Sequence, residues 1–173
     1  LDEIKGFSEY TNVSKCSTEV SLLEESIKKC QEKIESFNKR EELFKIVPST
    51  YESLDALVQN FEPYLKLWTN CMEFDIEKRQ CFEGPFIKLN FTKIEKKINQ
   101  EFYRNSIQLT KALDDLNNES AQKVAAEFKK DIEKFREKLW LIELLTTEAM
   151  VKKPAYWKEI AKECNVDSIE PND

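Results

Sequence analysis

Residues 51–72 read YESLDALVQNFEPYLKLWTNCM, and their apolar side chains recur every three or four positions, as on the buried face of a helix. The stripe runs from Tyr51 to Met72 and passes through Pro63. A proline inside a helix removes one backbone hydrogen bond and costs roughly 3 kcal/mol. We therefore expect a helix that kinks at Pro63 and is held together by tertiary packing.

The segment before this stripe predicts another long helix, starting at Ser17 or Thr18. Its apolar positions follow heptad spacing, which indicates a coiled-coil-like seam. The seam residues are Val20, Leu23, Ile27, Cys30, Ile34, Phe37 and Phe44. Because Cys30 and Cys71 lie on or beside apolar stripes, we expect both thiols to be buried like small apolar side chains.

Turn and capping signals divide the rest of the chain. The S-x-x-E pattern of Ser49–Glu52 predicts a capping box at the start of the second helix, and Gly84-Pro85 should end that helix. A third helix should open near Asn90, a polar break at residues 117–120 should precede a fourth, and Pro154 should begin a short last helix. Short loops between long amphipathic helices favour antiparallel neighbours. The predicted fold is therefore all-α, an elongated antiparallel bundle or bundles of about five helices.

Within such a bundle, single conspicuous residues have a structural explanation. Trp68, Trp140 and Trp157 are each expected to fill the core. The Lys-rich stretches FKKDIEKFREK and KIEKKINQ interleave acids with bases, so we interpret them as solvated helix faces. Three glycosylation-type triplets, which begin at Asn12, Asn90 and Asn118, are the only hint of secretion.

Composition excludes several function classes. The net charge of −6 disfavours nucleic-acid binding, and no apolar run reaches the roughly 20 residues that a membrane crossing needs. Five cysteines with no CxxC pair and no histidine make a metal site improbable and fit reduced thiols. The two glycines, Gly6 and Gly84, are too far apart to form a phosphate-binding loop, so we expect no cofactor and no catalysis. Leu1 in place of methionine suggests a piece of a longer chain.

Several short motifs occur in a fixed order between Tyr51 and Asp167: FEPYLKLW, GPFIKLN, IEKKI, IEKFREKLWLIELL and YWKEI. This order resembles the N-terminal half of the linker of dynein heavy chains. The residues that match the family signature most clearly are Phe61, Pro63, Leu67, Trp68, Gly84, Pro85, Phe86 and Trp157. Further matches are Asn90, Phe135, Leu139, Leu141 and Ile142. Three departures stand out: Cys81 where the family usually has Trp, Trp140 where it has Pro, and Ala155-Tyr156 where it has Arg-His.

The resemblance implies a mechanical role. A dynein linker is a curved helical rod that lies across the ATPase ring of the same heavy chain and bends as the ring cycles. It hydrolyses nothing itself and acts on microtubules only indirectly, and its other expected partners are the tail and its associated chains. The resemblance implies a leading helix from the tail or neck for residues 1–47 and linker subdomains for residues 48–173. The implied location is the cytoplasm or cytoskeleton, with the GPF-type turn favouring axonemal over cytoplasmic dynein. The alternative is a spectrin-like or coiled-coil spacer.

Overall fold

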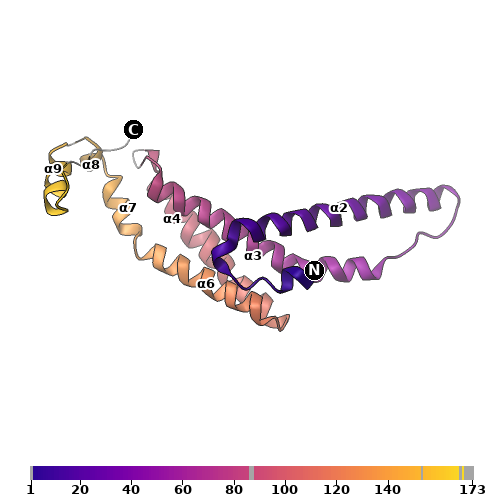
Figure 1. Ribbon diagram of the computed structural model, residues 1–173. Coiled ribbons are helices and arrows are strands. Elements are labelled where there is room, and N and C mark those ends of the chain that lie inside the picture. The colour runs from indigo at the N-terminus through magenta and orange to yellow at the C-terminus, as the bar shows by residue number, and fades with distance from the viewer. Residues whose placement is uncertain (1, 86–87, 153, 168, 170–173) are drawn as a thin grey trace. The chain divides into compact units, whose positions relative to one another are not determined.

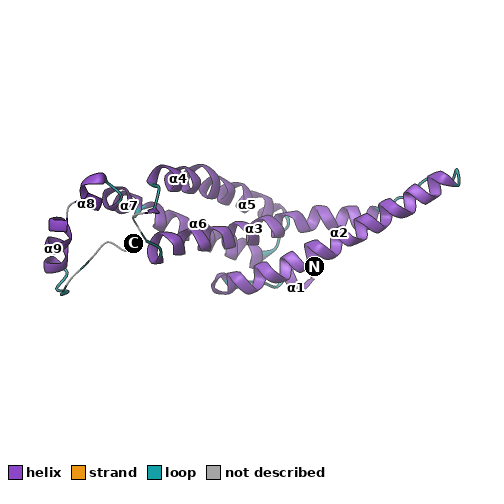
Figure 2. Cartoon of the chain, turned by 90° about the horizontal axis from the view of Figure 1, so that it is seen from above, coloured by secondary structure: helices purple, strands orange, loops and turns teal. Residues whose placement is uncertain are grey.

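The computed structural model describes residues 2–85, 88–152, 154–167 and 169, and every regular element within them is a helix (Figure 2). The all-α prediction is therefore confirmed. The elements are α1 Asp2–Lys5, the 3₁₀-helix η1 Tyr10–Asn12, α2 Val13–Leu43, α3 Glu52–Glu83, α4 Phe91–Lys96, the π-helix η3 Lys97–Phe102, α5 Tyr103–Asp115, α6 Glu119–Arg136, α7 Leu139–Leu145, α8 Glu148–Lys152 and α9 Pro154–Glu163.

The chain forms two compact units, and three helices contribute residues to both. Unit 1 comprises residues 1–72 and 108–127, and unit 2 comprises residues 73–107 and 128–173. The helices that are shared in this way are α3, α5 and α6. Each unit has its own buried apolar core, so each is described by itself below.

In unit 1, α2 begins at Val13, four residues before the predicted start, and it follows two short elements that the sequence did not indicate. Only the first half of its heptad seam is buried. Val20 and Ile27 are buried, whereas Cys30 is exposed and Phe37 and Phe44 are 52% and 77% exposed. The prediction that Cys30 is buried is therefore wrong, because its half of the helix is not covered by the described residues of unit 1.

A loop joins the end of α2 to α3 (Figure 1). One carboxylate ties this loop to the end of α2. Glu41 accepts hydrogen bonds from the backbone N–H of Ser49 at 2.7 Å and from the Ser49 hydroxyl at 2.7 Å. These bonds lower the pKa of Glu41 from its ordinary value. The Ser49 N–H is bound to Glu41 and is not available to the Glu52 carboxylate, and α3 begins only at Glu52, so the predicted capping box does not form.

The predicted third and fourth helices are present in altered form, and each contributes residues to both units. The third helix opens with Asn90 as its cap, as predicted, because the Asn90 side chain accepts a hydrogen bond from the N–H of Lys93. It then passes from α4 through the π-helix η3 into α5. The fourth helix is interrupted after Arg136. There the N–H of Lys138 bonds to the carbonyl of Phe135, three residues back instead of four, and this tighter turn separates α6 from α7.

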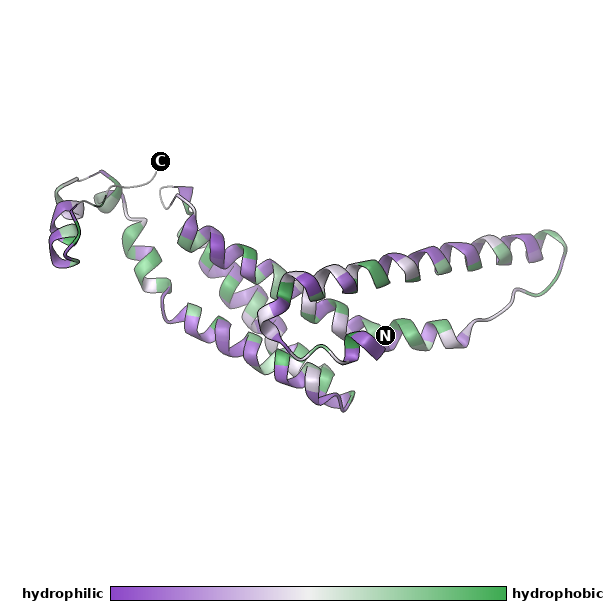
Figure 3. Ribbon diagram, viewed as in Figure 1, coloured by the Kyte–Doolittle hydropathy of each residue, from purple (hydrophilic) through white to green (hydrophobic). Residues whose placement is uncertain are grey.

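The core of unit 2 is centred on Phe74, whose ring makes edge-on contacts with Phe102, Phe128 and Phe135 at centroid distances of 5.5–5.8 Å. Polar and apolar residues alternate along α6 (Figure 3), and the apolar ones lie on the face of the helix that is buried. Trp140, on α7, is 63% exposed, so the prediction that it fills the core is wrong. Six of the seven residues of α7 are apolar, and the helix buries Leu139 and Ile142 instead.

Candidate functional site

The signature residues around Pro63 lie in unit 1, where α3 continues through the proline without interruption. Pro63 has no N–H to donate to the carbonyl of Gln59, so packing must compensate for the missing bond. Phe61, Leu67 and Trp68 are buried on the side of α3 that faces the core of this unit. The expectation of a helix that persists through Pro63 is therefore confirmed, and the kink stays a prediction.

A polar contact supports the same part of α3. The Asn118 side-chain amide donates hydrogen bonds to the hydroxyl of Tyr64 at 2.9 Å and to the carbonyl of Lys5 at 3.1 Å. Its carbonyl oxygen accepts from the N–H of Ala121 and so caps the start of α6. Because its side-chain nitrogen and oxygen are both hydrogen-bonded, Asn118, which begins one of the three glycosylation-type triplets, acts as a helix cap in unit 1. Phe7 completes the site by an edge-on contact with Trp68 at 5.9 Å.

The other signature residues belong to unit 2. Helix α3 ends at Glu83, directly before Gly84, as the sequence predicts. A Cβ at Gly84 would lie 2.5 Å from the carbonyl oxygen of Gln80, so this close approach requires glycine. Pro85 accepts a hydrogen bond from the N–H of Lys88 through its carbonyl, and Phe86 lies outside the described residues. Near the other end of the unit, buried Trp157 donates from Nε1 to the carbonyl of Met150 at 2.8 Å.

Unit 2 also contains ion pairs between helices. Lys97 of η3 lies 2.6 Å from Glu77 of α3, and the hydrogen bond between them raises the pKa of Lys97. Lys78 of α3 lies 2.7 Å from Asp131 of α6. These ion pairs fix side chains that the sequence indicated as solvated, so that interpretation is wrong for Lys97.

Cys81, also in unit 2, has a raised pKa. Burial is the larger cause and the nearby charge of Glu77 the next, and together they raise the pKa of Cys81 to about 11.

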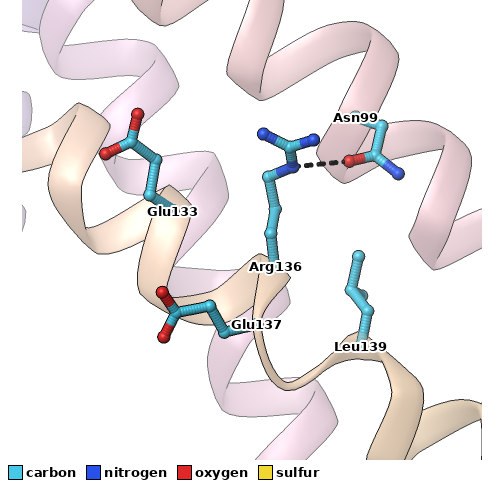
Figure 4. A pocket seen from close by; sticks show the side chains of 5 residues that line it. All are labelled: Asn99, Glu133, Arg136, Glu137 and Leu139. Carbon is cyan, nitrogen blue, oxygen red and sulfur yellow. Dashed lines mark hydrogen bonds between the residues drawn. The ribbon is translucent and has the colours of Figure 1, made fainter.

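A polar pocket of about 540 Å³ lies beside the π-helix (Figure 4). It is lined by Asn99, Glu133, Arg136, Glu137 and Leu139. Arg136 donates from Nε to Oδ1 of Asn99 at 2.7 Å, and its guanidinium carbon lies 4.1 Å above the centre of the Tyr103 ring. Sequence reasoning missed this site because a π-helix has no distinct sequence pattern and Arg136 lies in a run of alternating charges.

Across residues 2–85, 88–152, 154–167 and 169, no group of three or more cysteine, aspartate or glutamate side chains could hold a metal ion. In the same part of the chain, every helix is too short or too polar to cross a membrane.

Comparison with known proteins gives one consistent family. The model of the family described as dynein heavy chain, N-terminal region 2, matches residues 54–173. The chain is 25% identical to human dynein axonemal heavy chain 1 over 95% of its own length, and 29% identical to human dynein axonemal heavy chain 3 over 81%. It is 26% identical to human dynein axonemal heavy chain 12 over 94%. The matched region spans only 3–5% of these relatives. No solved structure matches the chain.

Proposed function

Because this chain belongs to the dynein heavy chain family, N-terminal region 2, we propose that it is a mechanical segment of the linker of a dynein heavy chain. In this role it transmits the ATP-driven movement of the ring into movement along microtubules and hydrolyses no nucleotide itself. Its partners are the ring and tail of the same heavy chain, and it touches microtubules only indirectly. The names of the relatives favour the axoneme as its location.

The observation that best supports this function is the continuity of α3 through Pro63. A segment that transmits displacement needs long helices whose irregularities are held by packing. Helix α3 has 32 residues, or about 48 Å of rise, and its proline is flanked by buried Phe61 and Tyr64. The hydrogen bond from Asn118 to Tyr64 gives this packing a fixed register.

The start of the family match at residue 54 supports a division of roles along the chain. We assign residues 48–173 to the linker subdomains and residues 1–47 to a leading helix from the tail or neck. The eight signature residues, Phe61, Pro63, Leu67, Trp68, Gly84, Pro85, Phe86 and Trp157, serve as structural positions of the linker in this assignment.

The test increases the backbone flexibility of α3 beside Pro63 and leaves the buried side chains of this helix unchanged. Glu62 and Lys66 are exposed and form an i,i+4 ion pair at 2.5 Å. The double variant E62G/K66G removes this pair and adds two flexible positions, each costing up to about 1 kcal/mol of helix stability. The matched control E62A/K66A removes the same pair and keeps helix propensity high.

Both variants are made in the parent motor, and gliding velocity and basal ATPase rate are measured in one preparation. We expect the glycine variant to glide more slowly than the alanine variant while both keep an ATPase rate within a few-fold of the parent. Equal gliding of the two variants would contradict the mechanical role and favour a passive spacer.

A further inference from the structure

The π-helix η3 aims neighbouring side chains at two different helices of unit 2. Lys97 reaches Glu77 on α3, while Asn99 reaches Arg136 on α6. Ile98 and Phe102 are buried in the same turn. A π-helix is rare, occurs mostly as a single turn inside an α-helix, and is frequent at functional sites. This irregular turn therefore places Asn99 where it can hold an arginine side chain.

Arg136 is held on two sides and left open on the third. Its Nε is bound to Asn99, and its guanidinium plane lies over Tyr103, an arrangement that gains cation–π energy and fixes the orientation. In the described residues, no hydrogen bond or ion pair engages its terminal nitrogens, Nη1 and Nη2. Figure 4 shows one of these nitrogens on the same side of the guanidinium as Asn99 and the other directed away from it. The terminal N–H groups of a guanidinium can bind the two oxygens of one carboxylate.

Two carboxylates line the same pocket without neutralising this arginine. Glu133 lies one turn before Arg136 on α6, and Glu137 follows it directly. Within the part of the chain that the structure describes, neither forms an ion pair with Arg136, and Glu133 makes only a 4.0 Å contact with Lys129. The pocket thus offers one positive and two negative groups. A multiply charged anion such as phosphate would be repelled by the two carboxylates.

We propose that this pocket binds a protein segment that presents an acidic side chain to Arg136 and a basic side chain to Glu133 and Glu137. The acidic side chain forms two hydrogen bonds with Nη1 and Nη2. Glu133 and Arg136 are one helical turn apart along α6, so a partner helix that carries an acid and a base one turn apart presents charges at a matching spacing. The proposal rests on the pocket alone and is independent of the linker assignment.

The test uses the 173-residue chain and a capped peptide of sequence AAEAAAKAA, which has one acid and one base a helical turn apart. Binding is followed by NMR through the Nε–H signal of Arg136 and the side-chain amide of Asn99. We expect both signals to shift with peptide concentration and to saturate. We also expect two control probes to bind at least about tenfold more weakly. The peptide AAQAAAKAA lacks the carboxylate that would bind Arg136, and inorganic phosphate would be repelled by Glu133 and Glu137.

Variants separate recognition from folding. R136K keeps the charge but loses the two-pronged donor, and E133Q/E137Q removes the acceptors for the base, so each should weaken binding of AAEAAAKAA. The matched control is R79Q, which removes an exposed arginine paired with Asp75 in the same unit and should leave binding unchanged. Thermal unfolding monitors the fold of each variant. Equal binding of AAEAAAKAA and AAQAAAKAA by the unaltered chain, or binding by R136K as tight as by the parent, would overturn the proposal.

Discussion

Replacement of Trp68 by alanine should destabilise the chain strongly. The Trp68 side chain is 1% exposed and makes an edge-on contact with Phe7 at 5.9 Å and 81°. Truncation of a fully buried tryptophan removes its buried area and leaves a cavity, which together cost about 3–5 kcal/mol. For a chain of this size, about 2–4 °C per kcal/mol converts that loss to a melting temperature lower by roughly 6–20 °C.

Trp140 supplies a matched control of the same residue type. It is 63% exposed, so Trp140→Ala should change the free energy of unfolding by less than about 0.5 kcal/mol. Urea unfolding of both variants, followed by far-ultraviolet circular dichroism, measures the difference. A loss below about 1 kcal/mol for Trp68→Ala, or equal losses for the two variants, would refute the reasoning from burial.

Three further outcomes follow from local geometry. Gly84→Ala should cost about 1–3 kcal/mol because its Cβ would meet a backbone carbonyl at 2.5 Å, whereas Gly6→Ala, with 3.3 Å, should cost less in the same unfolding assay. Asn118→Ala should cost about 1–3 kcal/mol in that assay, since it removes a helix cap and a partly buried hydrogen bond together, and a loss near zero would contradict its structural role. Because burial raises the pKa of Cys81 to about 11 from 9.0, its thiolate fraction near pH 8 should be about 100-fold below that of an ordinary thiol. Iodoacetamide should therefore label Cys81 more slowly than exposed Cys30, at a rate that keeps rising up to about pH 11, and equal rates would contradict this.

Periodicity predicted the helices well because burial of an apolar face determines where a helix packs. The stripe through Pro63 and the cap at Asn90 are direct consequences of residue spacing and side-chain chemistry, and both are present in the structure. The same reasoning failed where a residue forms a hydrogen bond with a different partner from the one that the local sequence pattern predicts. Ser49 can cap a helix, but its backbone N–H, which a capping box would give to Glu52, is bound by Glu41, eight residues earlier.

Burial of single residues was predictable only where the surrounding helix is covered. Trp68 and Trp157 are buried as expected, whereas Trp140 and Cys30 lie on helix faces that the described residues leave exposed. The Arg136 site was beyond prediction for a different reason. It depends on a π-helix turn and on a contact between residues 37 positions apart, neither of which a single sequence specifies.

The ratio of gliding velocity to ATPase rate in the parent motor tests the mechanical role most directly. The series K66A, K66G, E62A/K66A and E62G/K66G changes Lys66 alone or together with Glu62, both exposed on α3, and within each pair the variants differ in backbone flexibility. We predict that the ratio falls with each added glycine and is unchanged by the alanines. A ratio that stays constant across the series would contradict the account, because the helix around Pro63 would then transmit no displacement.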